Sequence, residues 1–255
     1  IGIKSLKIIT FGPRPQDFFA CNAPIKALYD LGVEIEENSE LDLLVSYKEH
    51  KGDKRIGAIV DDMAKELGEK GNTYPDLLER MAQFELTLLD WKENHKGERK
   101  YVAFASKCWP AFPESFGFEP CYVNSRLASR GIPVGCEVDI YGALSEYIAS
   151  CLTEAPVTLL DINNTVPEDL YKDDIAQKFD YKNNDLFMGF HCGNTPLSCL
   201  SCGAINYQII QNRLLENGGK PDFTRGTLEG DIKSGDITLF RLHANADSTL
   251  EAYCA

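Results

Sequence analysis

Three polar residues each follow a short apolar run of the kind that forms a buried strand. Glu137 comes after PVGC, Asp161 after VTLL and His191 after LFMGF. In an open α/β sheet, ligands bind in the crevice at the carboxyl ends of the strands, so these side chains are expected at one edge of a sheet. Carboxylate oxygens and an imidazole nitrogen suit a divalent cation such as Mn²⁺ or Mg²⁺. The pattern therefore predicts a cation site formed by these three residues.

Each of the three residues also has a purely structural interpretation. A glutamate just before a helix, such as Glu137, is stabilised by the positive end of the helix dipole. Asp161 begins the sequence DINNT, in which its side chain can hydrogen-bond the backbone of a turn. A single histidine in an apolar segment, such as His191, commonly packs in a core. Residue type and position leave both interpretations open for each residue.

Nine cysteines offer a second kind of metal site. His191, Cys192, Cys199 and Cys202 form the pattern H-C-x6-C-x2-C, which is compatible with a structural Zn²⁺. This set has one CxxC pair and no second matching pair, so buried thiols are its other interpretation. The cysteine count is odd and the residues are scattered through apolar segments, which is typical of reduced thiols in a cytoplasmic protein.

An aromatic loop is expected beside the predicted cation site. Trp109 lies in KCWPAFPESFGFEP, which follows the strand-like run Tyr101–Ser106. The face of an aromatic ring can stack on a sugar ring, so Trp109 is predicted to form one wall of a carbohydrate pocket. The alternative is a loop that packs its own aromatic side chains together.

Strand-like and helix-like segments alternate along the first part of the chain, and they must position these side chains. Asp139 is placed to cap the helix that follows Glu137. The alternation indicates an α/β fold with a mostly parallel sheet, and we expect a Rossmann-like three-layer domain over residues 1–220. Apolar runs and helical spacings predict strands at 4–11, 101–106, 157–160 and 186–190, and helices near 23–31, within 53–67, from 74 to 91 and at 140–151.

The pattern changes near residue 220. Residues 227–232, 237–243 and 249–253 alternate in polarity and are separated by the turn sequences KSGD and ANAD. This alternation predicts a β-meander, and we assign residues 221–255 to the start of an antiparallel β domain. Because three strands rarely form a stable unit alone, we expect the chain to end inside this domain.

Composition limits the classes of function. The 255 residues include 26 Lys and Arg against 39 Asp and Glu, a net charge of −13, which argues against a nucleic-acid partner because such binding needs a basic surface. No run approaches about 18 consecutive apolar residues, so no membrane span is predicted. Lys4 and Lys7 interrupt the early apolar stretch, so we expect no signal peptide and a cytoplasmic location. The sequence has no dinucleotide-binding, P-loop or serine-hydrolase motif.

Three sequence blocks together resemble the L-fucose isomerase and L-arabinose isomerase superfamily. They are GIPVGCEVDIYGALSEYI, LLDINN and FHCGN, and the match is specific because an aspartate follows Glu137 at a distance of 24 residues. The resemblance extends over most of the chain, from the first strand to GTLEGDI and ITLFRL. It implies a metal-dependent aldose–ketose isomerase that acts on a monosaccharide through a cis-enediol. The implied cofactor is Mn²⁺ or another divalent cation such as Mg²⁺ or Co²⁺.

The resemblance also implies roles for individual residues. Glu137 and Asp161 match the family's two acidic metal ligands, which also transfer protons, but the match does not assign which of them takes the proton from C2. His191 is similar in position to a metal-site histidine of the arabinose isomerase branch. In the fucose isomerase branch the ligand histidine comes from a later segment, which this sequence does not contain. Trp109 and Asn163 are expected to contact the sugar.

The architecture of the superfamily implies two Rossmann-like domains followed by an antiparallel β-barrel. Residues 1–220 would then be the second α/β domain and residues 221–255 the first strands of the barrel, as in a fragment of a longer protein. Members commonly form hexamers or related oligomers, so a homo-oligomer is expected. The alternative function is that of a sugar-binding or regulatory relative that keeps the fold without turnover.

Overall fold

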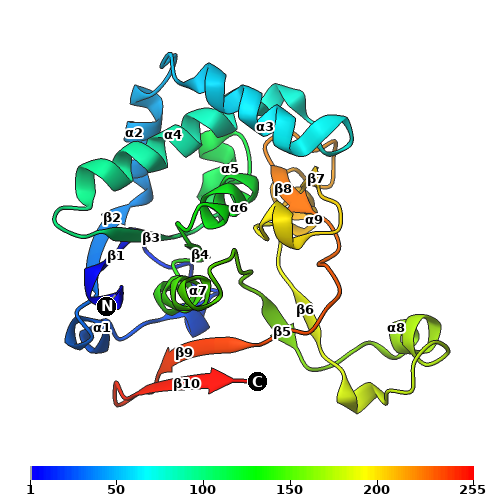
Figure 1. The fold of residues 1–255 in the computed structure, drawn as a ribbon. Helices are drawn as coiled ribbons and strands as arrows, with labels where there is room; N and C mark the ends of the chain where they lie inside the picture. Colours follow the sequence, from blue (N-terminus) through cyan, green and yellow to red (C-terminus); the bar gives the residue numbers. More distant parts are fainter. Residues whose placement is uncertain (1) are drawn as a thin grey trace.

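A four-stranded parallel sheet forms the centre of the molecule. The computed structural model describes residues 2–255 and places the strands in the order β2-β1-β3-β4 (Figure 1). The two inner strands, β1 and β3, are almost fully buried, as expected for apolar strands that are covered on both faces. The strands are β1 (Leu6–Gly12), β2 (Glu34–Ser39), β3 (Tyr101–Ser106) and β4 (Val134–Cys136).

Helices cover both faces of this sheet and complete three layers. Alternate residues of β1 divide between the two cores, since Ile9 and Phe11 belong to one and Leu6 and Ile8 to the other. The predicted α/β fold with a mostly parallel sheet is therefore confirmed. The first core contains side chains of α2 (Glu40–Glu49), α3 (Ile56–Gly71), α4 (Leu78–His95), α5 (Ala111–Phe116) and α6 (Cys121–Ser129), and the second contains those of α1 (Lys26–Asp30) and α7 (Ile140–Thr153).

The rest of the chain forms three separate antiparallel strand pairs. The predicted antiparallel pairing near the C-terminus is confirmed for β9 and β10, whereas β8 pairs with β7 and does not continue a meander. The domain boundary at residue 220 stays a prediction. The pairs are β5 (Asp161–Asn163) with β6 (Met188–Phe190), β7 (Ala204–Tyr207) with β8 (Arg225–Glu229), and β9 (Phe240–Ala244) with β10 (Leu250–Cys254), and the sequence between them includes the short helices α8 (Glu168–Leu170) and α9 (Ile209–Leu214).

The predicted strand at 157–160 is wrong. These residues are irregular and half-buried, and strand pairing begins only at Asp161, where β5 runs antiparallel to β6 with Asp161 opposite Phe190. The predicted strand at 186–190 exists as β6, but it belongs to this two-stranded ribbon and not to the parallel sheet. Thr158, Leu159 and Leu160 of this run line a cavity, which accounts for its two leucines without a sheet core.

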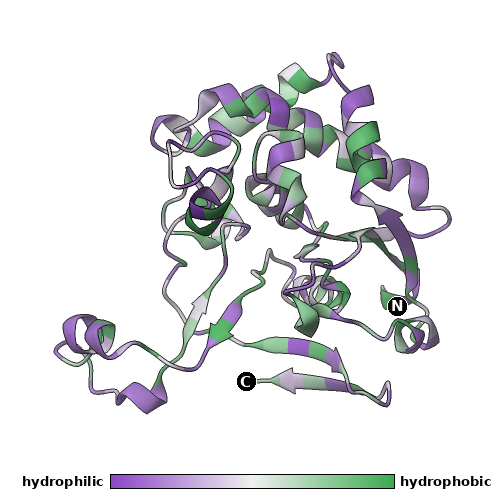
Figure 2. Ribbon diagram, turned by 180° about the vertical axis from the view of Figure 1, so that it is seen from behind, coloured by the Kyte–Doolittle hydropathy of each residue, from purple (hydrophilic) through white to green (hydrophobic). Residues whose placement is uncertain are grey.

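The segment 161–190, which contains β5, α8 and β6, extends away from the rest of the chain (Figures 1 and 2). Among residues 2–255, no helix is both long enough and apolar enough to cross a membrane. The large apolar side chains that the segment exposes are Ile162, Leu170, Phe179, Tyr181, Phe187 and Phe190.

The β9–β10 hairpin is attached to the first half of α7, beside which it lies in Figure 1. Arg241 of β9 donates from Nη1 and Nη2 to the two carboxylate oxygens of Asp139, at 2.7 and 3.0 Å. The N–H of Leu242 donates to Ser145 Oγ at 2.9 Å. The hairpin is therefore joined to the same helix that follows the end of β4.

Strand β4 and α7 approach each other closely at Gly135. A Cβ atom at this position would lie 2.4 Å from the carbonyl oxygen of Asp139 and 3.1 Å from the backbone nitrogen of Ala143. Both of these are backbone atoms at the start of α7, so they can move aside only if the helix shifts. Gly135 therefore sets the distance between the sheet and the helix that follows Glu137.

We expect Gly135→Ala to lower the free energy of unfolding by about 1–3 kcal/mol, because the added methyl group overpacks this contact. Denaturant unfolding followed by circular dichroism measures the change. The matched control is Gly57→Ala in α3, where no atom lies within 4 Å of the new Cβ, and where a helix gains about 0.5–1 kcal/mol from the exchange. Equal stability of Gly135→Ala and the wild type would show that β4 and α7 do not meet as described.

Candidate functional site

A cavity of about 1130 Å³ opens at the carboxyl ends of β3 and β4. Besides these strand ends, its wall includes parts of the β5–β6 ribbon, of α9 and of the β9–β10 hairpin. This edge of a parallel sheet is where α/β proteins bind ligands. Polar and aromatic residues of the wall include Cys108, Trp109, Cys136, Glu137, Asp139, Asp161, His191 and Arg241.

The cavity brings together most of the residues that the sequence singled out. Trp109, Glu137, Asp161 and His191 are part of its wall. Asn163 is not: it is exposed, and its Oδ1 accepts the backbone N–H of Thr165 at 3.0 Å. In this structure Asn163 stabilises a turn, and its contact with a sugar stays a prediction.

Glu137 is held in an unusual backbone conformation. It and Val138 have positive φ angles of 56° and 57°, which few residues other than glycine adopt, least of all a β-branched one. Such conformations cost about 1–3 kcal/mol each and cluster at active sites. Contacts of Asp139 fix the turn, since its N–H donates to the Cys136 carbonyl at 3.0 Å and its Oδ1 accepts the N–H of Gly142 at 2.8 Å. The predicted cap of α7 by Asp139 is confirmed.

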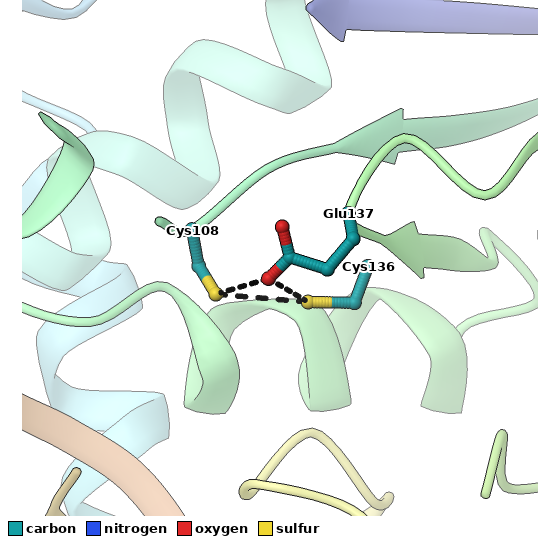
Figure 3. A group of neighbouring side chains, drawn as sticks. All are labelled: Cys108, Cys136 and Glu137. Atoms are coloured by element: carbon teal, nitrogen blue, oxygen red, sulfur yellow. Dashed lines mark hydrogen bonds between the residues drawn. The ribbon is translucent and has the colours of Figure 1, made fainter. Parts of the chain in front are cut away.

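The carboxylate of Glu137 is buried, and only one of its oxygens is hydrogen-bonded. Its Oε1 accepts from Cys108 Sγ at 3.1 Å and from Cys136 Sγ at 3.7 Å (Figure 3). Its Oε2 is buried without a hydrogen-bond partner among the described residues. Burial raises the pKa of Glu137 to about 7, against the hydrogen bond from Cys108, which lowers it. A carboxyl group that titrates near neutral pH can both take up and release a proton there.

Asp161 and His191 reach the cavity from the β5–β6 ribbon. Asp161 begins β5 opposite Phe190, and His191 directly follows β6, so strand pairing brings the two residues near each other. Desolvation raises the pKa of Asp161. Burial lowers the pKa of His191, but the neighbouring Cys192, Asp161 and Glu137 outweigh it and raise this pKa above its ordinary value. The imidazole is therefore an electrostatic partner of both carboxylates.

Glu137, Asp161 and His191 fit a divalent cation in their chemistry, but their atoms do not converge in this structure. Two carboxylates and an imidazole are suitable ligands for Mn²⁺. Glu137 Oε2 and His191 Nδ1 are buried atoms without hydrogen-bond partners in the described part of the chain, and a ligand would satisfy them. Within residues 2–255, however, these three side chains do not form a group with ligand atoms inside 4.8 Å of one another. Joint binding of one cation would therefore require side-chain movement.

The sulfurs that meet are not those predicted to hold zinc. Throughout the described chain, the one group of three ligand-type side chains within 4.8 Å of one another is Cys108, Cys136 and Glu137. Cys108 and Cys136 were not singled out from the sequence, although Cys108 follows the run Tyr101–Ser106 as Glu137 follows its own strand. The structure does not bring together the predicted set of His191, Cys192, Cys199 and Cys202.

Acidic side chains dominate the charge of the cavity wall. Asp17, Glu137, Asp139 and Asp161 line it, whereas Arg241 is the one lysine or arginine in the wall as far as the chain is described. Arg241 is already paired with Asp139 through two hydrogen bonds. The cavity is therefore electrostatically suited to a cation.

Glu146 is a further buried carboxylate near the site that the sequence patterns did not identify. It lies on α7, is 6% exposed, and its Oε2 has no hydrogen-bond partner among residues 2–255. Burial raises its pKa to about 8, against the effect of His191, which lowers it. Its position gave no signal, because a glutamate on a helix normally faces solvent.

The chain is similar in sequence to known sugar isomerases, although no protein-family model matches it. It is 25% identical to the sulfoquinovose isomerase of Alkalicoccus urumqiensis over 94% of its own length and 48% of that protein. It is 27% identical to the sulfoquinovose isomerase of Priestia megaterium over 96% of its length and 49% of the relative. It is 31% identical to the sulfoquinovose isomerase of Clostridium sp. (strain MSTE9) over 64% of its own length and 37% of that protein. The chain spans about half the length of the first two of these curated relatives.

The buried carboxyl group of Glu146 makes the stability of the fold depend on pH. Its pKa is about 8 in the folded chain against an ordinary 4.5, so the folded state binds the proton more tightly than the unfolded state. The resulting stability is fully present below pH 4.5 and is lost as the pH rises to about 8. At about 1.4 kcal/mol per pH unit, the loss is about 5 kcal/mol at most.

We expect Glu146→Gln to remove this contribution, because the amide carries no charge to bury. The free energy of unfolding should exceed that of the wild type at pH 8 and approach it near pH 4.5. Urea unfolding at a series of pH values measures both. Glu154→Gln, at the exposed end of α7, is the matched control and should follow the wild type. If Glu146→Gln kept the pH dependence of the wild type, the carboxyl group would not be buried as described.

Proposed function

We propose that the chain is part of a metal-dependent aldose–ketose isomerase in which Glu137 and Asp161 transfer protons. The proposal is carried by one observation: a carboxyl group with a pKa of about 7 shares the wall of one cavity with a second carboxylate and an imidazole. Similarity to proteins named sulfoquinovose isomerase supports it. The resemblance to L-fucose and L-arabinose isomerases supports it as well.

The isomerisation of an aldose moves a proton from C2 to C1 through a cis-enediol. The proton on C2 is only weakly acidic, so the negative charge that develops on the sugar oxygens as it leaves must be stabilised. Glu137, Asp161 and His191 are the residues that would hold Mn²⁺, or Mg²⁺ or Co²⁺ in its place. Such a cation supplies Lewis-acid stabilisation of the sugar oxygens, worth several kcal/mol.

Glu137 and Asp161 share the proton transfer in this proposal. Because the pKa of Glu137 is about 7, its carboxyl group can accept a proton and return it at neutral pH. Asp161 is the second acid–base group, and its pKa is also raised. Which of the two takes the proton from C2 is left unassigned. Trp109 offers an aromatic face against which a sugar ring can stack.

The proposed substrate is a monosaccharide aldose. Sulfoquinovose is a candidate from the names of the relatives, and L-fucose and L-arabinose are candidates from the resemblance. The one guanidinium group in the described wall is paired with Asp139, so that wall fits a neutral sugar better than a sulfonated one. Assembly into a homo-oligomer, a hexamer or a related form, is also part of the proposal.

Exchange with solvent tests the reaction directly. In D₂O, we expect Mn²⁺-dependent deuterium at the reacting carbon of one aldose, because the transferred proton passes through carboxyl groups that exchange with water. NMR of a panel that includes sulfoquinovose and neutral aldoses measures it, with the full-length protein that contains this chain. If the folded protein bound a sugar but exchanged no proton with any aldose, the function would be that of a non-catalytic sugar-binding or regulatory relative.

We expect Glu137→Gln and Asp161→Asn each to slow this exchange by about 10²–10⁴-fold, because an amide cannot accept the proton. The matched controls are Glu168→Gln and Asp169→Asn in the exposed helix α8, which should exchange like the wild type. Circular dichroism checks that each variant is folded. A wild-type rate in either site variant would remove that residue from the proton transfer.

A further inference from the structure

Two thiols and a carboxylate meet in the inner wall of the cavity. Cys108 Sγ lies 3.7 Å from Cys136 Sγ and 3.1 Å from Glu137 Oε1, and Cys136 Sγ lies 3.7 Å from the same oxygen (Figure 3). Cys136 is the last residue of β4, where it pairs with Ser106 of β3, and Cys108 follows two residues beyond that end of β3. Both thiols point to one carboxylate oxygen, while Glu137 Oε2 has no partner in the described part of the chain.

These spacings match one face of a tetrahedral metal site. With metal–sulfur bonds of about 2.3 Å and metal–oxygen bonds of about 2.1 Å, tetrahedral geometry separates two sulfurs by about 3.8 Å and a sulfur from an oxygen by about 3.6 Å. The corresponding separations in the structure are 3.7 Å for the two sulfurs and 3.1 and 3.7 Å for sulfur and oxygen. Little movement of the three side chains would therefore be needed to hold an ion.

We propose that Cys108, Cys136 and Glu137 bind one thiophilic divalent ion, Zn²⁺ or Cd²⁺, with its fourth position open to the cavity. Thiolates select such ions over Mn²⁺ and Mg²⁺, so this site differs in kind from the proposed Mn²⁺ site of Glu137, Asp161 and His191. Binding releases the two thiol protons, and the proton of Glu137 where it carries one, to solvent and leaves two thiolates and a carboxylate as ligands. The residues are 3%, 5% and 6% exposed, so two thiolates and a carboxylate surround the ion in a largely water-free corner.

The site shares Glu137 with the proposed isomerase. An ion bound here holds the carboxylate oxygen and prevents it from accepting a proton, so Zn²⁺ inhibits turnover until a chelator removes it. This consequence for turnover rests on the proposed function. The binding of the ion is independent of the proposed function, because it is inferred from the spacing of the sulfur and oxygen atoms.

Titration of the reduced, metal-free protein with Cd²⁺ tests the site without a measurement of turnover. We expect an ultraviolet thiolate-to-cadmium charge-transfer band that saturates at one ion per chain. Cys108→Ser and Cys136→Ser should each weaken binding at least about tenfold. The matched control is the double variant Cys199→Ser/Cys202→Ser, which removes the two sulfurs of the CxxC pair and should bind Cd²⁺ like the wild type.

X-ray absorption by the Zn²⁺-loaded wild type gives a second readout that does not depend on the folding of any variant. We expect two sulfur neighbours at about 2.3 Å together with oxygen or nitrogen at about 2.0–2.1 Å. A shell of oxygen and nitrogen alone, or a cadmium band that survives both single changes, would overturn the proposal. If the ion binds through two sulfurs and no aldose exchanges a proton, the thiol site stands and the proposed isomerase fails.

Discussion

One carboxylate, that of Asp139, joins the parts of the molecule that surround the cavity. Its Oδ1 accepts the N–H of Gly142 at the start of α7, and its two oxygens accept from Arg241 of the β9–β10 hairpin. It also ends the turn in which Glu137 and Val138 have positive φ angles. A strained backbone persists only where surrounding contacts over-determine it, and these contacts do so. The placement of Glu137 therefore depends on a residue that has no part in the proposed chemistry.

Local patterns are enough to predict the two inner strands of the central sheet and the helices α3, α4 and α7, but they do not predict the edge strand β2. Strand β3 occupies the predicted residues 101–106, and α3, α4 and α7 lie close to their predicted positions, because each buries a continuous apolar stripe. Local patterns do not predict which of the later strands pair with each other. Alternating polarity locates β8 but does not reveal that it pairs with β7, because strand pairing depends on contacts that are distant in the sequence. The apolar run at 157–160 is predicted as a strand because a local pattern does not distinguish residues that face a cavity from residues that face a core.

The residues selected from the sequence reach the cavity for two different physical reasons. Glu137 follows a strand of the parallel sheet, β4, as expected from the sequence. Asp161 and His191 do not, and they reach the cavity because the antiparallel ribbon passes along its edge. Cys108 and Glu146 went unnoticed because a cysteine is commonly a small buried hydrophobe and a helical glutamate commonly faces water. Only the folded structure shows that these two side chains are buried and which groups lie near them.

The two carboxyl groups and the imidazole of the cavity lie on elements of unequal stiffness. Glu137 stands at the end of a buried parallel strand between two helical layers, whereas Asp161 and His191 stand on a ribbon of three-residue strands whose side chains are largely exposed. The free energy of local opening is lowest where the fewest side chains are buried. Thermal motion therefore changes the separation of the two carboxyl groups mainly through the ribbon. A ligand that displaces the ribbon therefore also changes the spacing of the two carboxyl groups, while the sheet stays in place.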